Sequence, residues 1–393
     1  MIHDASGTAN IADTGDVLGR HAEGQPDSAA AAASFRAGEA MYRRSVIVGP
    51  NQIEFEDVPL PQPGPRQVLV RVAAAAVCTW EQRVYTGVDN WSYPLVGGHE
   101  FSGEVVAVGP GVTQVLAAGD QVAIAGLRRC GECWACRRGY DNICDNQHAA
   151  TRQPGRPWGP SGFGQYALLE GYQVYRYPRP VSPFEAALAE PLACVLHDVK
   201  RFTPRRGDTA VIVGAGIMGL LHLAVLRASG AVVVVSEPDP LRRAKALEMG
   251  AAATIDPATE EYVAAVQRLT DGRGASVTYV AIGVPSAIEL AVQAAAKRGI
   301  VSVYASIHPR GTSIQVDPNV FHHKEVMLSG SLAQDHEDFL DAVWSIGNHT
   351  IDLKPLLSAS YPLADLAQAF AAAARADTYR VFVTPNRALT ISH

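Results

Sequence analysis

The stretch TAVIVGAGIMGLLHLAVL, residues 209–226, carries three glycines in the pattern G-x-G-x-x-G, at Gly214, Gly216 and Gly219. The glycines follow a β-branched run and precede an apolar run, so the stretch predicts a strand, a tight turn and a helix. Gly214 permits the turn, Gly216 lets the backbone approach a pyrophosphate, and Gly219 lets the helix pack closely on the strand. The stretch therefore predicts a dinucleotide-binding unit.

The next strand-like run, AVVVVSE at 231–237, indicates which dinucleotide binds. It ends in Glu237, whose carboxylate can accept hydrogen bonds from the ribose hydroxyls of the adenosine. The same carboxylate would repel a 2′-phosphate, which favours NAD over NADP. Arg242 and Arg243 follow closely and support the alternative, a phosphate site, although cations on such helices are more often solvated.

Strand-like and helix-like runs alternate around this stretch, which predicts a doubly wound parallel sheet, a Rossmann domain, over residues 192–332. Residues 41–191 contain short strand-like runs broken by Gly and Pro, which predict a partly open β-barrel. Residues 333–393 end in a helix-like run at 365–376 and a strand-like run at 379–384, and we expect them to return to the barrel domain. The chain of 393 residues is long enough for two domains, so the expected fold class is α/β.

Residues 1–40 differ from the rest of the chain. They are rich in Ala, Gly, Asp and Ser, contain six acidic and two basic residues and have almost no periodic apolar pattern, so they cannot bury enough surface to order themselves. We expect a disordered tail there, with a functional arm as the alternative.

Composition excludes several classes of function. The formal net charge of −6 and the lack of a basic tract argue against nucleic-acid binding. The start of the chain lacks a signal-peptide pattern, and the longest apolar run is short for a membrane span. Six cysteines in 393 residues do not make a disulfide scaffold. We therefore expect a cytoplasmic protein whose thiols are available to metals.

Four of those cysteines lie in CGECWACRRGYDNIC, residues 130–144, with the spacing C-x2-C-x2-C-x7-C. Four thiolates complete a tetrahedral Zn²⁺ shell with no vertex open to a substrate. The pattern therefore predicts a structural zinc site, and an iron–sulfur cluster is the main alternative. The ligands would be Cys130, Cys133, Cys136 and Cys144.

Three other short motifs contain further metal-binding residue types: AAVCTWEQR with Cys78, GGHEFSGEVVAVG with His99 and Glu100, and LAEPLACVLHDVKR with Glu190. Each motif is weak alone. Together with the four-cysteine lobe, GDQV and the glycine pattern, in this order, they resemble the zinc-dependent medium-chain dehydrogenases, the alcohol and polyol dehydrogenase family. Glu190 in the EPL motif is similar to the sorbitol and threonine dehydrogenase branch, and the resemblance covers residues 41–393.

The resemblance implies a GroES-like barrel domain beside the Rossmann domain and two zinc ions per chain. A catalytic zinc would be held by Cys78, His99 and either Glu100 or Glu190, leaving one vertex open to the alcohol. Glu81 would hydrogen-bond His99 and fix its tautomer. The cofactor-binding residues would be Gly214, Gly216, Ile217, Met218, Gly219, Glu237, Arg242 and Arg380, the last reaching the pyrophosphate.

The chain departs from the family pattern after Cys78. Trp80 lies where a Ser or Thr usually passes the proton out, and an indole cannot do so. Thr79 could supply a displaced hydroxyl. Trp80, Tyr85, Trp91 and the segment 148–163 are the candidate substrate-pocket residues, with ordinary packing and a plain surface loop as the alternatives.

The resemblance implies oxidation of a secondary alcohol to a ketone, with hydride transfer to NAD. The expected substrates are polyols, sugar alcohols, cyclitols or amino sugars. One alternative is a threonine-like amino-alcohol dehydrogenase, and an alternative of another class is a non-catalytic nucleotide-binding member of the fold. The resemblance also implies a homodimer or homotetramer, joined through an edge strand at 324–331.

Overall fold

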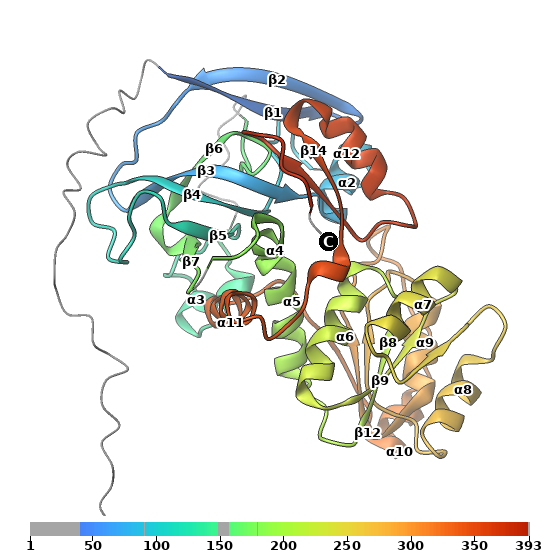
Figure 1. Ribbon diagram of the computed structural model, residues 1–393. Helices are drawn as coiled ribbons and strands as arrows, with labels where there is room; N and C mark the ends of the chain where they lie inside the picture. The colour runs from blue at the N-terminus through green and yellow to red at the C-terminus, as the bar shows by residue number, and fades with distance from the viewer. Residues whose placement is uncertain (1–39, 90, 148–156, 179, 392–393) are drawn as a thin grey trace, which may run out of the picture. The chain divides into compact units, whose positions relative to one another are not determined.

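Six parallel strands form the sheet predicted around the glycine stretch (Figure 1). The computed structural model describes residues 40–89, 91–147, 157–178 and 180–391, so the predicted tail lies almost entirely outside the described residues. The strand order is β10-β9-β8-β11-β12-β13. The strands are β8 (Thr209–Val213), β9 (Val232–Ser236), β10 (Ala253–Ile255), β11 (Ala275–Val280), β12 (Ala295–Val303) and β13 (Met327–Gly330).

The strand order reverses between β8 and β11, because the chain runs outward from β8 to β10 before it crosses back. A dinucleotide binds at the carboxyl ends of the strands at such a reversal. Helices cover the sheet: α6 (Ile217–Ser229), α7 (Pro240–Glu248), α8 (Tyr262–Leu269), α9 (Pro285–Ala294) and α10 (Pro318–Lys324). Alternate residues of β8 enter two different cores, Ala210 and Ile212 one and Val211 and Val213 the other. The sheet is therefore buried on both faces.

The glycine turn has the geometry that its sequence predicts. Gly214 has φ of +102°, a value that side chains rarely tolerate. A Cβ on Gly219 would lie 1.9 Å from the carbonyl oxygen of Gly214, so α6 packs against the turn more closely than any other residue would permit. Gly216 is the N-cap of α6 and provides no side-chain cap, so the first N–H groups of the helix have no capping side chain.

A seven-stranded sheet forms the second domain, with the order β14-β15-β3-β4-β5-β7 and β6 paired to β3. Its members are β3 (Gln67–Ala76), β4 (Glu100–Val108), β5 (Gln121–Ala125), β6 (Tyr166–Glu170), β7 (Val174–Arg176), β14 (Leu357–Pro362) and β15 (Arg380–Thr384). A separate antiparallel ribbon precedes it, β1 (Met41–Gly49) and β2 (Gln52–Pro59). The expected fold class, a barrel-like domain beside a Rossmann domain, is confirmed.

The remaining helices connect or cover these sheets: α2 (Thr79–Thr86), α3 (Trp134–Arg137), α4 (Pro183–Ala187), α5 (Ala189–Arg201), α11 (His336–Gly347) and α12 (Leu366–Ala373). Helix α5 contacts α6 of the Rossmann domain, α11, and strands β4 and β5 of the barrel domain. The predicted domain boundary at 191/192 falls inside the first turn of α5. This helix therefore belongs to both domains, and the division into 41–191, 192–332 and 333–393 stays a prediction.

Strand β12 begins at Ala295, before the β-branched residues that favour a strand in its sequence. Its first residues, AAKRG, contain no β-branched side chain, so their strand conformation carries no propensity signal. Strand β13 lies at the sheet edge within the predicted segment 324–331. Assembly through that edge stays a prediction.

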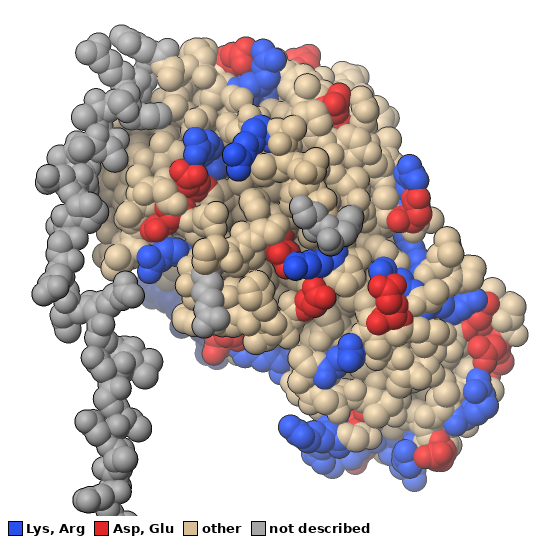
Figure 2. Space-filling model, viewed as in Figure 1, with Lys and Arg blue, Asp and Glu red and all other residues tan. Residues whose placement is uncertain are grey.

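The surface gives no sign of a single-charge field on the face shown in Figure 2, where basic and acidic side chains are intermixed. None of the helices in the described part of the chain is both long and apolar enough to cross a membrane.

Candidate active site

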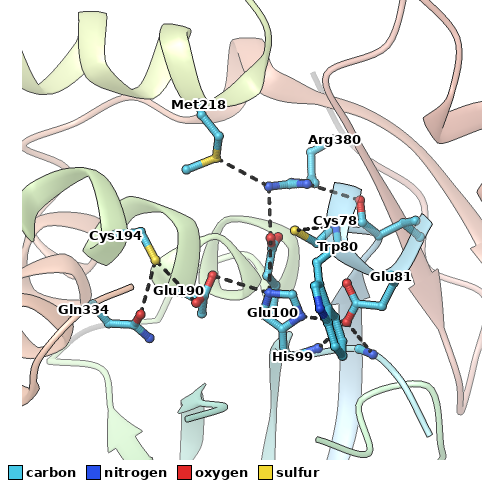
Figure 3. A network of polar contacts seen from close by, with 12 residues as sticks. Cys78, Trp80, Glu81, His99, Glu100, Glu190, Cys194, Met218, Gln334 and Arg380 are labelled. Carbon is cyan, nitrogen blue, oxygen red and sulfur yellow. Dashed lines mark hydrogen bonds and ion pairs between the residues drawn. The ribbon is translucent and has the colours of Figure 1, made fainter. Parts of the chain in front are cut away.

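Cys78, His99 and Glu100 come together where strands β3 and β4 meet helix α2. One ligand atom from each lies within 4.8 Å of the others. Cys78 is the N-cap of α2, where its sulfur accepts a hydrogen bond from the N–H of Trp80 at 3.5 Å. His99 directly precedes β4, whose first residue is Glu100, and Glu100 is 1% exposed. The thiol, the imidazole and the carboxylate therefore converge on one point (Figure 3).

Glu81 fixes the orientation of the His99 ring. Its Oε1 lies 2.6 Å from Nδ1 of His99 and accepts the N–H groups of Gly98 at 2.9 Å and His99 at 3.1 Å. Because a carboxylate only accepts, Nδ1 carries the hydrogen and Nε2 is left to bind a metal. Nε2 indeed faces the two remaining carboxylates, at 4.0 Å from Glu100 and 3.9 Å from Glu190.

Glu190 lies in the first turn of α5, buried beside this cluster. The thiol of Cys194, one turn along the same helix, lies 3.4 Å from the Glu190 carboxylate and 3.2 Å from Oε1 of Gln334. Burial, and then the charge on Glu190, raise the pKa of Cys194 well above that of an ordinary thiol, so it acts as a hydrogen-bond donor. Cys194 and Gln334 were not predicted, although the i, i+4 spacing from Glu190 gives a signal for Cys194.

Arg380 connects the metal-binding cluster to the glycine helix. It comes from β15, is 2% exposed, and its Nη2 pairs with Oε1 of Glu100 at 3.0 Å. Nη1 donates to the carbonyl of Val77 at 3.1 Å, and Nη2 lies 3.9 Å from the sulfur of Met218 in the first turn of α6. One buried guanidinium thus contacts both domains (Figure 3).

The donors fit a zinc ion. Sulfur, nitrogen and carboxylate oxygen are the ligands that catalytic zinc uses, with three protein ligands and one open position. Oε2 of Glu100 is buried and has no hydrogen-bond partner among the described residues, so it is free to bind an ion. Burial raises the pKa of Glu100 to about 7, although Arg380 and His99 lower it. Burial and Glu100 likewise raise the pKa of Cys78, so a cation bound between these groups would favour their ionised forms.

Tryptophans cover one side of the cluster. Trp80 packs edge-on against the His99 ring at 5.5 Å between centroids and against Trp91 at 5.2 Å. Trp91 in turn lies 5.7 Å from Trp158. Trp80, Trp91 and Trp158 are here called the tryptophan wall. Of the other candidate pocket residues, Tyr85 stacks on Phe370 in the barrel core at 4.5 Å, and residues 148–156 lie outside the described part of the chain.

Thr79 is the exposed first residue of α2, with no hydrogen bond from its hydroxyl to the described residues of the cluster. Its role in proton transfer stays a prediction.

Glu237 lies beside the glycine turn at the end of β9, 6% exposed. Its Oε2 accepts the N–H of Ala215 at 2.8 Å and its Oε1 accepts the N–H of Asp239 at 3.0 Å. Arg242 lies close to the same turn, since its Nη1 would be 3.9 Å from a Cβ on Gly216, and its Nε donates to the carbonyl of Ala376 at 3.0 Å. Each carboxylate oxygen of Glu237 retains a lone pair for a ribose hydroxyl.

The four lobe cysteines lie on one side of the barrel domain, around α3. Their sulfurs all lie within 4.8 Å of one another, with pairs at 3.5 and 4.0 Å, and no disulfide joins any of the six cysteines. Thiolates around one zinc ion are about 3.8 Å apart, which follows from a Zn–S distance of about 2.3 Å. The N–H groups of Glu132 and Cys133 donate to Cys130 and lower its pKa to about 6. The spacing therefore fits a single ion better than a cluster of several irons.

Comparison with known families agrees with this arrangement. Residues 64–179 match the model of the alcohol dehydrogenase GroES-like domain, and residues 218–346 match that of the zinc-binding dehydrogenases. The first match contains Cys78, His99, Glu100 and the lobe cysteines. The second begins at Met218, in the first turn of the glycine helix.

Individual relatives extend the comparison. The chain is 38% identical to the L-threonine 3-dehydrogenase of Pyrococcus abyssi, over 70% of this chain and 78% of that one. It is 29% identical to the sorbitol dehydrogenase of Halalkalibacterium halodurans, over 86% of this chain and 97% of that one. Among solved structures, a zinc-binding dehydrogenase of Sinorhizobium meliloti bound to NADP superposes with a TM-score of 0.81, at 27% identity, covering 88% of this chain and 100% of that one.

Proposed function

This chain belongs to the zinc-dependent medium-chain alcohol dehydrogenase family and interconverts an alcohol and its ketone; from that premise we propose that it uses NAD, holds two zinc ions and acts on a secondary alcohol of a polyhydroxylated compound. The observation that carries the proposal is the convergence of the half-buried Cys78 and His99 with the buried Glu100, which Arg380 connects to the glycine helix.

Cys78, His99 and one of the two carboxylates, Glu100 or Glu190, would hold the catalytic zinc. A zinc ion bound there supplies the positive charge that favours loss of the alcohol proton near neutral pH. Glu81 keeps the hydrogen on Nδ1 of His99, so that Nε2 stays oriented as a ligand. Arg380 offsets the charge of Glu100, and the tryptophan wall keeps water away from the cluster.

The coenzyme would lie across the glycine turn. The N–H groups at the start of α6 have no side-chain cap and would bind the pyrophosphate. Glu237 would accept the adenosine ribose hydroxyls, and its charge would oppose a 2′-phosphate. Arg242 is the nearest counter-argument, and its hydrogen bond to Ala376 directs its Nε away from the turn.

Replacing Glu237 by Gln tests this assignment, because it removes the charge and keeps the size and an acceptor. We expect the ratio of kcat/KM for NAD⁺ over NADP⁺ to fall by about tenfold or more, since repulsion of the 2′-phosphate disappears. Steady-state kinetics with both coenzymes measures the ratio. The control is Glu248→Gln, which removes an exposed carboxylate of α7 that pairs only with Lys245 among the described residues. An unchanged ratio in Glu237→Gln contradicts the NAD assignment.

A threonine-like amino-alcohol dehydrogenase is the second candidate, favoured by the similarity to the Pyrococcus enzyme. A nucleotide-binding protein without turnover is the third. It is disfavoured because a protein that only binds a nucleotide needs no buried set of thiol, imidazole and carboxylates with a free ligand position.

The test is the change in nicotinamide absorbance of zinc-loaded protein with a panel of polyols, cyclitols, amino sugars and threonine, each with NAD⁺ and NADP⁺. Turnover of polyhydroxylated compounds with NAD⁺ is the expected result. Turnover confined to threonine selects the second candidate. No turnover by protein that contains two zinc ions contradicts the proposed substrate class.

A further inference from the structure

Asp89 lies in the barrel domain and pairs with a residue of the Rossmann domain. Its Oδ2 lies 3.0 Å from Nε of Arg83 on α2, and its Oδ1 lies 3.3 Å from Nδ1 of His308. Asp89 is 7% exposed, so both contacts are shielded from water. Each carboxylate oxygen therefore holds one partner, and the pair Asp89–His308 spans the two domains.

The pair fixes the state of the His308 ring. Because Asp89 only accepts, Nδ1 of His308 carries the hydrogen, and Nε2 is left as the second, outward atom of the ring. That Nε2 is buried and has no hydrogen-bond partner in the described part of the chain. A buried polar atom without a partner costs free energy, so such atoms usually await a ligand or a water.

Asp89, the barrel-domain member of the pair, is connected to the metal-binding cluster through a series of contacts. The N–H of Trp91 donates to the carbonyl of Asp89 at 2.9 Å. Trp91 packs on Trp80, and Trp80 packs on His99. Asp89 is therefore connected to the metal ligands through Trp91 and Trp80.

The Rossmann-domain end lies on the coenzyme side. His308 follows the carboxyl end of β12, the end at which parallel sheets of this kind bind dinucleotides. In the same segment, the carbonyl of Ser306 would be 2.4 Å from a Cβ on Gly283, in the turn after β11. Tyr304 packs on His222 of α6 at 4.7 Å. The His308 segment thus lies at the coenzyme-binding end of the sheet, and Asp89 joins it to the segment that contains Trp91.

We propose that Asp89 and His308 form a subsite that binds a second hydroxyl group of the substrate, beyond the carbon that is oxidised. His308 is the specificity-determining residue, Asp89 positions it, and Trp80 and Trp91 cover the C–H face of the substrate. This inference rests on the proposed function and assigns the residues that would recognise the second hydroxyl group of its substrate.

The charges of the subsite favour a neutral hydroxyl over an anion. The carboxylate of Asp89 already faces Arg83 on one oxygen and His308 on the other. These three side chains therefore include no unpaired cation that could bind a carboxylate or phosphate. A hydroxyl group can either donate to Nε2 of His308 or accept from it, and neither hydrogen bond needs a charge on the ligand.

The experiment compares wild type, His308→Leu and His308→Gln with three probes: sorbitol and 2,3-butanediol, and 2-butanol as a monoalcohol without the second hydroxyl. We expect His308→Leu to lower kcat/KM for sorbitol and 2,3-butanediol, which have a second hydroxyl group, by about tenfold to a hundredfold. The value for 2-butanol should stay within about threefold of wild type. His308→Gln, which keeps a hydrogen-bonding group, should recover part of the loss. The control is His323→Leu, which replaces an exposed histidine of α10 and should leave kcat/KM unchanged for all three probes.

Equal losses with all three probes would show that His308 only holds the domains together, and no loss with any probe would show that it does not face the substrate; either result overturns the inference. A second readout does not depend on turnover. Tryptophan fluorescence of the NADH complex measures the dissociation constants of sorbitol and 2-butanol. In His308→Leu the dissociation constant of sorbitol should rise, and that of 2-butanol should stay unchanged. If the wild-type protein oxidises no alcohol, the proposed function fails. The dissociation constants still test the subsite in that case. Identical dissociation constants for sorbitol in wild type and His308→Leu would overturn the subsite.

Discussion

Replacing Cys78 by Ala is expected to leave one zinc ion per chain and to lower kcat/KM by at least about a thousandfold. The variant removes one of the convergent ligands and leaves His99 and Glu100 unable to hold the ion with three protein donors. Loss of the metal removes several kcal/mol of charge stabilisation in the transition state, which corresponds to about that factor. Zinc content by atomic spectrometry and steady-state kinetics provide the measurements.

Two other cysteine variants make this result specific. Cys194→Ala removes a thiol from the same region, but Cys194 donates to Glu190 and Gln334 and lies outside the convergent group, so two zinc ions should remain. Cys133→Ser should lose the other zinc ion, because it breaks the four-thiolate lobe. Two zinc ions in Cys78→Ala, or turnover close to that of wild type, would contradict the assigned catalytic site.

Replacing Arg380 by Met is expected to destabilise the zinc-free protein by about 3–5 kcal/mol. The variant leaves the carboxylate of Glu100 buried without its cation, and an unpaired buried charge carries a cost of this order. The free energy of unfolding in guanidinium chloride measures the change. We also expect weaker binding of NADH, since the guanidinium contacts the first turn of the glycine helix through Met218.

A double variant separates the ion pair from simple packing. In Arg380→Met with Glu100→Gln neither charge remains, so the unfolding free energy should recover most of the loss seen in Arg380→Met. Arg375→Met is the matched control, because Arg375 is exposed and pairs with exposed Asp377 close to it in the chain. A double variant as unstable as Arg380→Met alone would show that the guanidinium acts through its contacts with Val77 and Met218 and not through Glu100.

The sequence predicts the fold well because its signals are local. The glycines of the 209–226 stretch indicate backbone conformation and close packing at their own positions, and the lobe cysteines predict a metal site through their spacing alone. Local signals fail where the pairing with neighbouring strands, and not local propensity, determines the conformation. The segment AAKRG at the start of β12 is an example.

The site is only partly readable for the same reason. The resemblance gives Cys78, His99 and two carboxylates, but Nε2 of His99 lies almost equally far from Glu100 and Glu190, and the choice between them stays open. The Asp89–His308 pair joins two segments far apart in the chain, and neither residue lies in a motif. Only folding brings them together.

The position of β15 in its sheet has a consequence for biosynthesis. Strand β15 pairs with β3 in the interior of the seven-stranded sheet, yet it follows every other described strand in sequence. Proteins emerge from the ribosome N-terminal end first, so the Rossmann strands are all exposed to solvent and able to pair before β15 exists. Until then the end of β3 at Ala75 and Ala76, beyond its pairing with β6, has no partner on that edge, and Glu100 has no Arg380. The barrel domain is thus begun first and completed last, and a chaperone would find its unfinished edge throughout synthesis of the Rossmann domain.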